Sequence, residues 1–537
     1  LSRAIVESLA RDAGRAGDDL YRVTGGNPFF VSQALAVEAG RVAPNVREAV
    51  LARASHLPAP ARAMLDLASV VPDRVVLTVL ERASNSNSND IDACVERGLL
   101  AFDAGQVFFR HELARLAIEQ ALSPIERVRL NLRILGVLAE APNPDAALLT
   151  RLAHHAVAAH DAQAIVKYAP QAAAVASARG AHREAATLID ATIPYASALS
   201  VRERAGFYEQ AATAYLLVAQ GERALAMNAA AYERWAELAD PIAMGRNRVR
   251  RCMLIWSVRT QALRSVGEIG AEAVDLLEGT AATDELALAR WWCAIPETFG
   301  TGIAGVAHRD ALARLATAST AARTCIDAWI LISIAEYHMS GAPRAESVER
   351  LVHEARSAGD DLGVMMGFSR RAWALSRDRD LAGLERCIAD GQAFARDRQL
   401  EHFLPSHAID QFAADVAAAR GRWATAEDLY GSLAKRNTLP IFFRVPYCLP
   451  PLNLIRARLG KPYDVRWADE FASSDAMLFH FEVYPIQRAL AEIAWLSGDV
   501  DTARASAQKL AAIADAWKHP WALGEAAVWQ RLAGIET

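Results

Sequence analysis

The hydrophobic pattern of the chain changes at residues 107–122. A short β-prone run, Val107 to Phe109, leads there into apolar positions at helical spacing, and His111 stands at the join. Before this stretch the pattern alternates between helical and strand periods, whereas after it the period is helical almost throughout. We therefore expect a mainly α protein, in which a compact module of helices and short strands precedes a long helical region.

Residues 1–40 have the pattern of a helical segment that contains a sharp corner. Helical periods occur on both sides of residues 24–28. Gly25 and Gly26 permit positive φ angles, and Pro28 suits the first turn of a new helix. Spacing alone therefore predicts two helices joined by a turn.

Residues 41–140 have the pattern of a winged-helix-like module. Short helical segments are followed by a β-hairpin over residues 98–110, whose turn is Asp103-Ala104-Gly105. Carboxylates outnumber guanidinium groups in residues 75–98, which would be the DNA-reading region, so we expect the module to pack within the protein instead. The predicted helices span residues 45–54, 60–70, 75–83 and 90–98.

Residues 141–537 have the pattern of paired helices and resemble degenerate tetratricopeptide-like repeats in a long solenoid. Turn glycines recur at a spacing of roughly 40 residues, and an alanine stands five residues after several of them. A glycine ends one helix, and a small side chain lets the next helix approach closely. The glycines are Gly180, Gly221, Gly341, Gly421, Gly460 and Gly498, and the alanines are Ala185, Ala226, Ala426 and Ala503.

Tryptophan is confined to this helical region. All 12 tryptophans lie at or after Trp235. They fit two interpretations: filling the interfaces between helices, or forming a concave ligand surface that uses Trp256, Trp291, Trp292 and Trp329. The sequence leaves both interpretations open.

Composition limits the class of protein. The formal net charge of −5 argues against non-specific nucleic-acid binding. The 6 cysteines stand far apart without a C-x-x-C pair, which predicts buried thiols rather than a zinc site or a disulfide framework. Because neither a membrane-spanning run nor a signal-peptide pattern occurs, we expect a cytoplasmic protein.

No catalytic or metal motif is complete. The stretch that begins with His111 resembles H-E-x-x-H, but Arg115 stands where the second histidine is needed. His154 and His155 point apart on a helix, and no G-x-x-x-x-G-K-[ST] phosphate loop occurs. We therefore predict no catalytic and no metal-binding residues, and His111 taken alone is a capping or packing residue.

Two motifs resemble those of STAND-class P-loop NTPases, in particular the large ATP-binding transcriptional regulators of the LuxR type. The run Leu20 to Val31 resembles the end of their ATPase module, where a Gly-x-Pro motif in the lid lies against the adenine. Gly26, Asn27 and Pro28 match that motif. The resemblance thus divides the chain into a lid segment (1–40), a winged-helix-like domain and the repeats.

The second motif is Phe109-Arg110-His111-Glu112-Leu113, which resembles the Met-His-Asp motif of the winged helix in this class. There the histidine touches the β-phosphate of bound ADP. His111 would take that role, while Arg110 replaces the methionine. Because the Walker motifs do not occur, the resemblance implies ATP or ADP binding only together with an ATPase half upstream of residue 1.

The implied function is the regulatory and sensor region of an ATP-dependent bacterial transcriptional regulator. A small-molecule or protein inducer would bind the repeats and favour self-association, and DNA would be bound by a helix-turn-helix after residue 537. Two alternatives stay open: the control region of an adenylate or guanylate cyclase or a protein kinase, and a nucleotide-free scaffold for partner proteins. Whether the chain belongs to an enzyme, such as a slow ATPase switch, also stays open.

Overall fold

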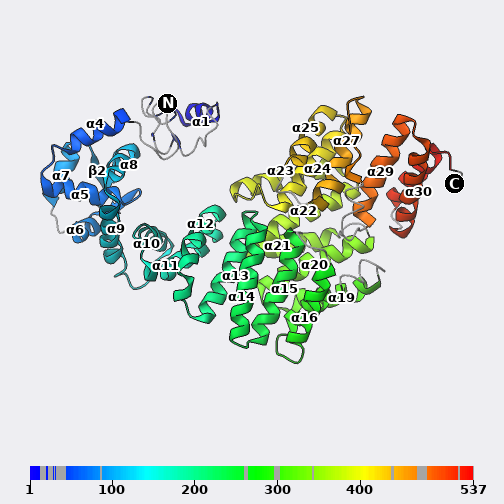
Figure 1. Ribbon diagram of the computed structural model, residues 1–537, viewed down its shortest axis with the longest axis horizontal. Coiled ribbons are helices and arrows are strands. Elements are labelled where there is room, and N and C mark those ends of the chain that lie inside the picture. The colour runs from blue at the N-terminus through cyan, green and yellow to red at the C-terminus, as the bar shows by residue number, and fades with distance from the viewer. Residues whose placement is uncertain are drawn as a thin grey trace. The chain divides into compact units, whose positions relative to one another are not determined.

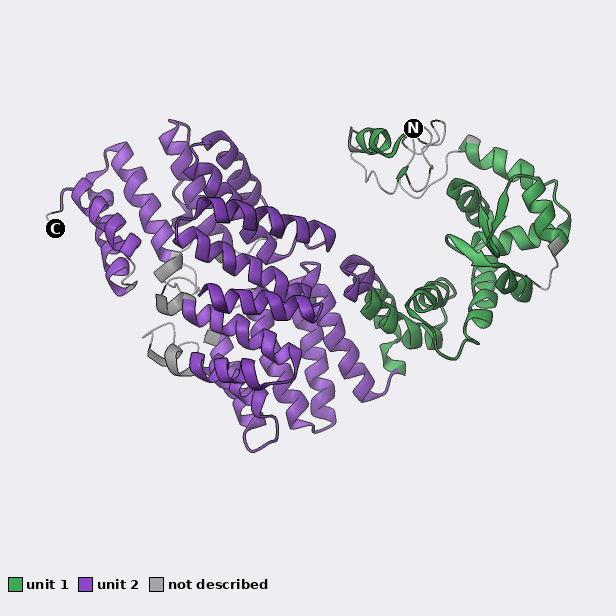
Figure 2. Ribbon diagram, turned by 180° about the vertical axis from the view of Figure 1, so that it is seen from behind, with its two compact units in different colours: residues 1–175, 188–198 green, residues 176–187, 199–537 purple. Residues whose placement is uncertain are grey.

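The computed structural model describes residues 1–12, 20, 21, 24, 28, 31, 35, 44–84, 88–258, 264–294, 303–340, 344–436, 441–468, 480–517 and 520–535. These residues form two compact units (Figure 2). Unit 1 comprises residues 1–175 and 188–198, and unit 2 comprises residues 176–187 and 199–537. Helices dominate both units, so the predicted mainly α fold class is confirmed (Figure 1).

The middle of unit 1 contains both helices and strands. A helix, a strand, two helices and a hairpin follow one another, and the three strands form one antiparallel sheet in the order β1-β3-β2. The elements are α4 (Pro44–Ala54), α5 (Ala59–Ser69), β1 (Arg74–Val76), α6 (Leu77–Ser84), α7 (Ser88–Glu96), β2 (Leu100–Asp103), β3 (Gln106–Phe109), α8 (Glu112–Ala121) and α9 (Pro124–Leu138); α1 (Arg3–Asp12) precedes them.

Strand β1 corrects the sequence prediction, which placed a helix over residues 75–83. Residues 74–76 are extended, and the helix begins only at Leu77. Val75 is buried and pairs with Val107 of β3. Three residues are too few to show a strand period, and it is pairing with a distant strand that fixes their conformation.

The predicted hairpin turn is confirmed. Asp103 pairs with Gln106, so Ala104 and Gly105 form a two-residue loop with φ angles of 48° and 78°. A tight turn between antiparallel strands needs positive φ at both central residues. Gly105 adopts such an angle freely and marks the turn in the sequence, whereas Ala104 adopts one only at a conformational cost that the pairing of β2 with β3 offsets.

One hydrophobic core joins the winged-helix-like module to the first helices of the array. Leu65 of α5 and Val107 of β3 are fully buried in the same cluster as Ile134 of α9 and Leu152 of α10. The module is therefore continuous with the start of the repeats.

From α10 onward the described chain consists of helices, and those of unit 2 form a solenoid in which successive helices run antiparallel. Successive helices contact one another through unit 2 (Figure 1). No helix in the described residues is long and apolar enough to cross a membrane. The elements are α10 (Ala146–Ala158), α11 (Ala162–Ala178), α12 (His182–Thr192), the 3-10 helix η1 (Ile193–Ala198), α13 (Val201–Leu217), α14 (Gly221–Glu237), α15 (Pro241–Val258), α16 (Arg264–Leu277), α17 (Thr283–Cys293), α19 (Ile303–Ala318), α20 (Ala322–Ser340), α21 (Ala345–Ser357), α22 (Asp361–Arg377), α23 (Leu381–Asp397), α24 (Leu404–Ala419), α25 (Trp423–Ala434), α26 (Ile441–Tyr447), α27 (Leu449–Arg458), α29 (His480–Ser497), α30 (Val500–Trp517) and α31 (Pro520–Leu532).

The turn glycines are confirmed at four positions and wrong at one. The four with positive φ are Gly180, Gly421, Gly460 and Gly498. Gly221 instead begins α14, and the left-handed residue of that turn is Ala219, with φ 61°. Gly221 is needed for close packing, because a Cβ there would lie 2.3 Å from the Val258 side chain. Gly341 lies outside the described residues.

In the repeats predicted to contain a small residue after the turn, the buried alanine lies five residues after the residue with positive φ, whether or not that residue is a glycine. Ala185, Ala426 and Ala503 are buried as predicted, whereas Ala226 is exposed. The buried alanine of that repeat is Ala224, five residues after Ala219. Backbone handedness at the turn therefore sets which side chain faces the neighbouring helix.

The tryptophans predicted to form either packing or a ligand surface are packed. Trp256, Trp291, Trp292 and Trp329 are all buried. Trp292 lies against the other two nearby rings, with centroids 5.0 Å from Trp291 and 6.2 Å from Trp256. Helix packing is thus the main role of this group.

The close approach of α16 to α17 can be tested at Gly270. A Cβ there would lie 2.4 Å from the backbone nitrogen of Cys293, and backbone cannot give way as a side chain can. We expect Gly270→Ala to lower the free energy of unfolding by about 1–3 kcal/mol.

The matched control is Gly206→Ala in α13, where nothing lies within 4 Å of an added Cβ. This change should raise the free energy of unfolding, by about 0.5–1 kcal/mol. Urea unfolding followed by circular dichroism measures both variants, and equal midpoints would contradict the close approach.

A second prediction concerns pH. His155 is fully buried, with Nδ1 2.8 Å from the Asn131 side-chain oxygen, and burial lowers the pKa of His155 to about 3, aided by the charges of His154 and Arg151. The unfolded chain binds a proton at this histidine below about pH 6.5, whereas the folded chain does not. The free energy of unfolding should therefore fall between pH 6.5 and 3, by up to about 1.4 kcal/mol per pH unit.

His155→Gln should flatten this dependence, because glutamine has no charge to gain. The exposed His56 supplies the control, and His56→Gln should leave the dependence unchanged. Urea unfolding at a series of pH values gives the slope, and an unaltered slope in His155→Gln would show that this residue is not the titrating group.

Candidate functional site

Most of the residues predicted to face the adenine lie outside the described part of the chain. Gly26 and Asn27 lie outside the described residues, whereas Pro28 is described as helical and exposed. The nucleotide-facing lid therefore stays a prediction.

His111 lies at the junction of β3 and α8. It is the N-cap residue of α8 by backbone position, with extended angles (φ −138°, ψ 128°), and its side chain is exposed. Partial desolvation and then the guanidinium groups of Arg110 and Arg53 lower the pKa of His111. Arg53 comes from the last turn of α4, which packs on α8 through Val46. No local pattern in the sequence places Arg53 near His111.

Arg115 explains why the incomplete H-E-x-x-H motif is structural. Its buried guanidinium forms ion pairs of 2.8 Å with Glu112 and with Glu119, and donates to the backbone oxygen of Ser69 at the end of α5. Burial alone would lower the pKa of Arg115, but the two carboxylates outweigh it and raise the pKa. Arg115 thus anchors α8, and with it His111, on α5. No group of three metal-ligating side chains occurs in the described residues.

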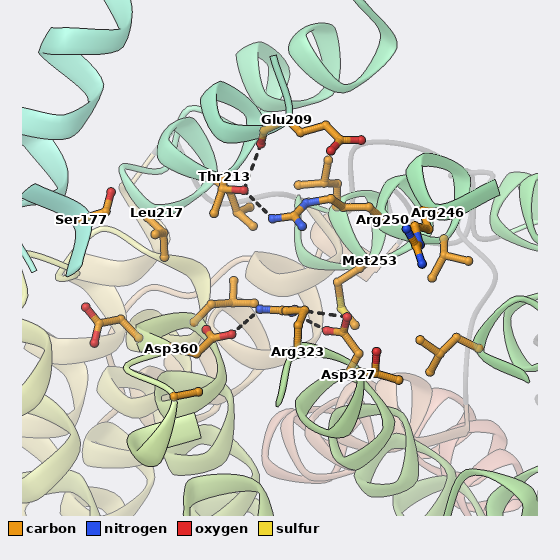
Figure 3. Close-up of a pocket in the computed structure, with 18 of the residues that line it drawn as sticks. Ser177, Glu209, Thr213, Leu217, Arg246, Arg250, Met253, Arg323, Asp327 and Asp360 are labelled. Atoms are coloured by element: carbon orange, nitrogen blue, oxygen red, sulfur yellow. Dashed lines mark hydrogen bonds and ion pairs between the residues drawn. The ribbon is translucent and has the colours of Figure 1, made fainter. Parts of the chain in front are cut away.

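A cavity lies wholly within unit 2. It has a volume of about 530 Å³, which suits a small molecule (Figure 3). Its walls come from α11, the start of α12, α13, α15, α17, α20 and the segment that leads into α22. The lining residues are Ser177, Ala178, His182, Glu209, Thr213, Leu216, Leu217, Arg246, Val249, Arg250, Met253, Leu254, Glu285, Leu288, Trp292, Arg323, Thr324, Asp327, Leu331, Ala358, Gly359, Asp360, Asp361 and Leu362.

Arg323 is enclosed between two carboxylates on one wall of this pocket. It forms ion pairs with Asp327, one turn along α20, and with Asp360, which also caps α22 by accepting from the Gly363 amide (Figure 3). Burial would lower the pKa of Arg323, but Asp327 and Asp360 raise it well above its ordinary value. Arg323 is therefore charged and compensated.

Arg250 stands in a different environment on the facing wall. Its guanidinium donates to the hydroxyl of Thr213, a neutral group (Figure 3). Burial, and then the positive charge of Arg323, lower the pKa of Arg250. Within the described residues no carboxylate forms an ion pair with it. Arg250 is thus a cation that the described protein does not neutralise directly.

A contact between distant repeats closes the pocket. Nε2 of His182 lies 2.9 Å from Oδ2 of Asp361, and both side chains are buried although 179 residues separate them. Arg398, at the end of α23, lies 3.7 Å from the same Asp361 oxygen and also donates to the backbone oxygen of Ala178. The first helices of unit 2 are therefore held against α22 and α23.

Sequence reasoning missed this pocket almost completely. Of the residues named above, Trp292 alone was proposed to face a ligand, and it does line the pocket. Arg250, Arg323 and Asp361 belong to helices far apart in sequence, and each looks like an ordinary surface charge. A helical-repeat prediction implies that distant helices can meet, but it does not say which ones.

Comparisons with known proteins give remote similarities. Neither a protein-family model nor a curated protein matches the chain. A solved STAND protein with a tetratricopeptide-repeat sensor, from Pyrococcus horikoshii, is 12% identical over 93% of this chain and 73% of its own, with a TM-score of 0.32. A circular tandem repeat protein is 13% identical over 91% of this chain and 96% of its own, with a TM-score of 0.13. Similarities this remote assign no function.

The contact between distant repeats can be tested with Asp361→Ala. Removing the carboxylate leaves the buried Nε2 of His182 without its hydrogen-bond partner. This loss should lower the free energy of unfolding by about 1–3 kcal/mol. Hydrogen exchange should speed up in residues 182–187 and at the start of α22. Arg183→Ala is the control, because Arg183 is exposed and lies 3.8 Å from the exposed Glu401. Equal exchange rates in both variants would mean that the contact between His182 and Asp361 does not stabilise the packing of α12 against α22.

Proposed function

We propose that this chain is the regulatory and sensor region of a STAND-class, ATP-dependent bacterial transcriptional regulator of the LuxR type. The observation that carries the proposal is His111 at the start of α8, exposed and flanked by the positive charges of Arg53 and Arg110. A β-phosphate is an anion, and a histidine among guanidinium groups suits its recognition. The nucleotide would be held jointly with ATPase residues upstream of residue 1, and Gly26, Asn27 and Pro28 would face its adenine.

The repeat array supports the sensor half of the proposal. An open solenoid offers a large surface for partners, and this one also contains a pocket of small-molecule size. An inducer there would favour the ATP-bound, self-associating form, and a helix-turn-helix after residue 537 would bind DNA. In this proposal the protein acts in the cytoplasm.

Two other functions share parts of these features. The same order of modules fits the control region of an adenylate or guanylate cyclase or a protein kinase, and the solenoid alone fits a nucleotide-free scaffold. The coding sequence on both sides distinguishes the first alternative, because a cyclase or kinase domain would replace the helix-turn-helix. Nucleotide binding distinguishes the scaffold.

His111 gives the direct test, in a protein that includes the upstream ATPase residues. We expect His111→Ala to speed ADP release by roughly tenfold or more, since a hydrogen bond to a charged phosphate is lost. Release of a fluorescent ADP analogue measures the rate, and His56→Ala, an exposed histidine elsewhere in unit 1, is the control. An unchanged rate would remove His111 from the nucleotide site, and no nucleotide binding at all would favour the scaffold.

A further inference from the structure

We propose that the pocket of unit 2 binds a small monocarboxylate with an apolar body, and that Arg250 holds its carboxylate. This inference deepens the proposed function and rests on its sensor role for the array, because it names the chemical class of the inducer.

Arg250 has hydrogen-bond donors that the described residues leave unused. A guanidinium has five N–H donors, and the Thr213 hydroxyl is its one hydrogen-bond acceptor among the described residues. Partly burying a cation without a direct counter-ion is unfavourable, as the lowered pKa of Arg250 reflects. A carboxylate would supply two acceptor oxygens in the geometry that guanidinium binds best.

The other charged side chains of the pocket already have ion-pair or hydrogen-bond partners. Arg246 pairs with Glu285 at 2.6 Å, and Arg323 pairs with Asp327 and Asp360. Asp361 contacts His182 and Arg398. The remaining carboxylate, Glu209, accepts from the Trp235 indole at 3.0 Å.

The same carboxylates limit the charge of the ligand. One directly uncompensated guanidinium matches one negative charge, whereas a phosphate or a polyanion would bring excess charge close to Asp327, Asp360 and Glu209. A monocarboxylate therefore fits better than a nucleotide. A ligand cation would in turn meet Arg250 itself.

The rest of the lining suits an apolar body with few polar groups. Leu217, Met253, Leu288 and Leu331 line the pocket together with Trp292. Nε1 of Trp292 is buried without a hydrogen-bond partner in the described residues, as is Nδ1 of His182. Occupation would also tie α13 and α15 to α20 and the start of α22, and so stabilise unit 2.

The test uses the protein of residues 1–537 and four probes: octanoate, the neutral octan-1-ol, the cationic octylammonium, and ATP. Isothermal titration calorimetry should detect octanoate binding at least about tenfold tighter than binding of the alcohol, the cation or ATP. Arg250→Gln should weaken octanoate binding by about tenfold or more. Arg250→Lys, which keeps the charge but not the two-pronged geometry, should bind with intermediate affinity.

Arg248→Gln is the matched control. Arg248 lies on the same helix, α15, but is ion-paired with Glu272 and stacked on Tyr232 outside the pocket. It should bind octanoate as the parent does. Circular dichroism establishes that each variant is folded. If Arg250→Gln does not fold, Arg250→Lys still tests the role of Arg250.

Three results would overturn the proposal: octylammonium or ATP binding as tightly as octanoate, octanoate binding that ignores Arg250, or no octanoate binding at millimolar concentration. None of these depends on nucleotide at His111. Failure of the ADP test would remove the nucleotide switch and leave the carboxylate pocket standing, so the two proposals fail separately.

Discussion

The arrangement of unit 2 depends on one buried contact, between His182 and Asp361. In a solenoid most helices touch only their neighbours in sequence, so the curvature of the array follows from the small rotation at each repeat. Here a histidine of α12 and the first residue of α22 meet at 2.9 Å, and Arg398 adds a second link from the end of α23. These contacts hold the helices of distant repeats at the positions that form the facing walls of the pocket.

The charges within the pocket follow from that closure. When helices of distant repeats are brought together, their arginines and carboxylates must pair or lose hydration. Arg323 pairs with Asp327 of its own helix and with Asp360 of the segment that leads into α22. Arg250 receives only a hydroxyl, which is the imbalance that a ligand could correct. Packing requirements and ligand chemistry thus meet in the same few side chains.

Unit 1 fixes His111 by a different device. Its position depends on Arg115, whose buried guanidinium joins two carboxylates of α8 to the end of α5. A rigid helix start, an exposed imidazole and the neighbouring Arg53 and Arg110 then form a positive region that is built before any ligand arrives. The two candidate sites differ accordingly: one lies exposed at the start of α8, and the other is a pocket assembled from distant repeats.

The sequence by itself determined the features that adjacent residues encode. Helical periodicity predicted the solenoid, Ala104-Gly105 set the hairpin turn, and the change of pattern at residue 107 placed His111 at the start of a helix. Tertiary structure decided whatever depends on distant partners. Strand β1 forms because β3 lies beside it, and Arg250 becomes a half-buried cation in a pocket because α13, α15 and α20 meet. Local patterns carry the preferences of the backbone, whereas a cavity and its charge balance arise from distances between residues that no local pattern records.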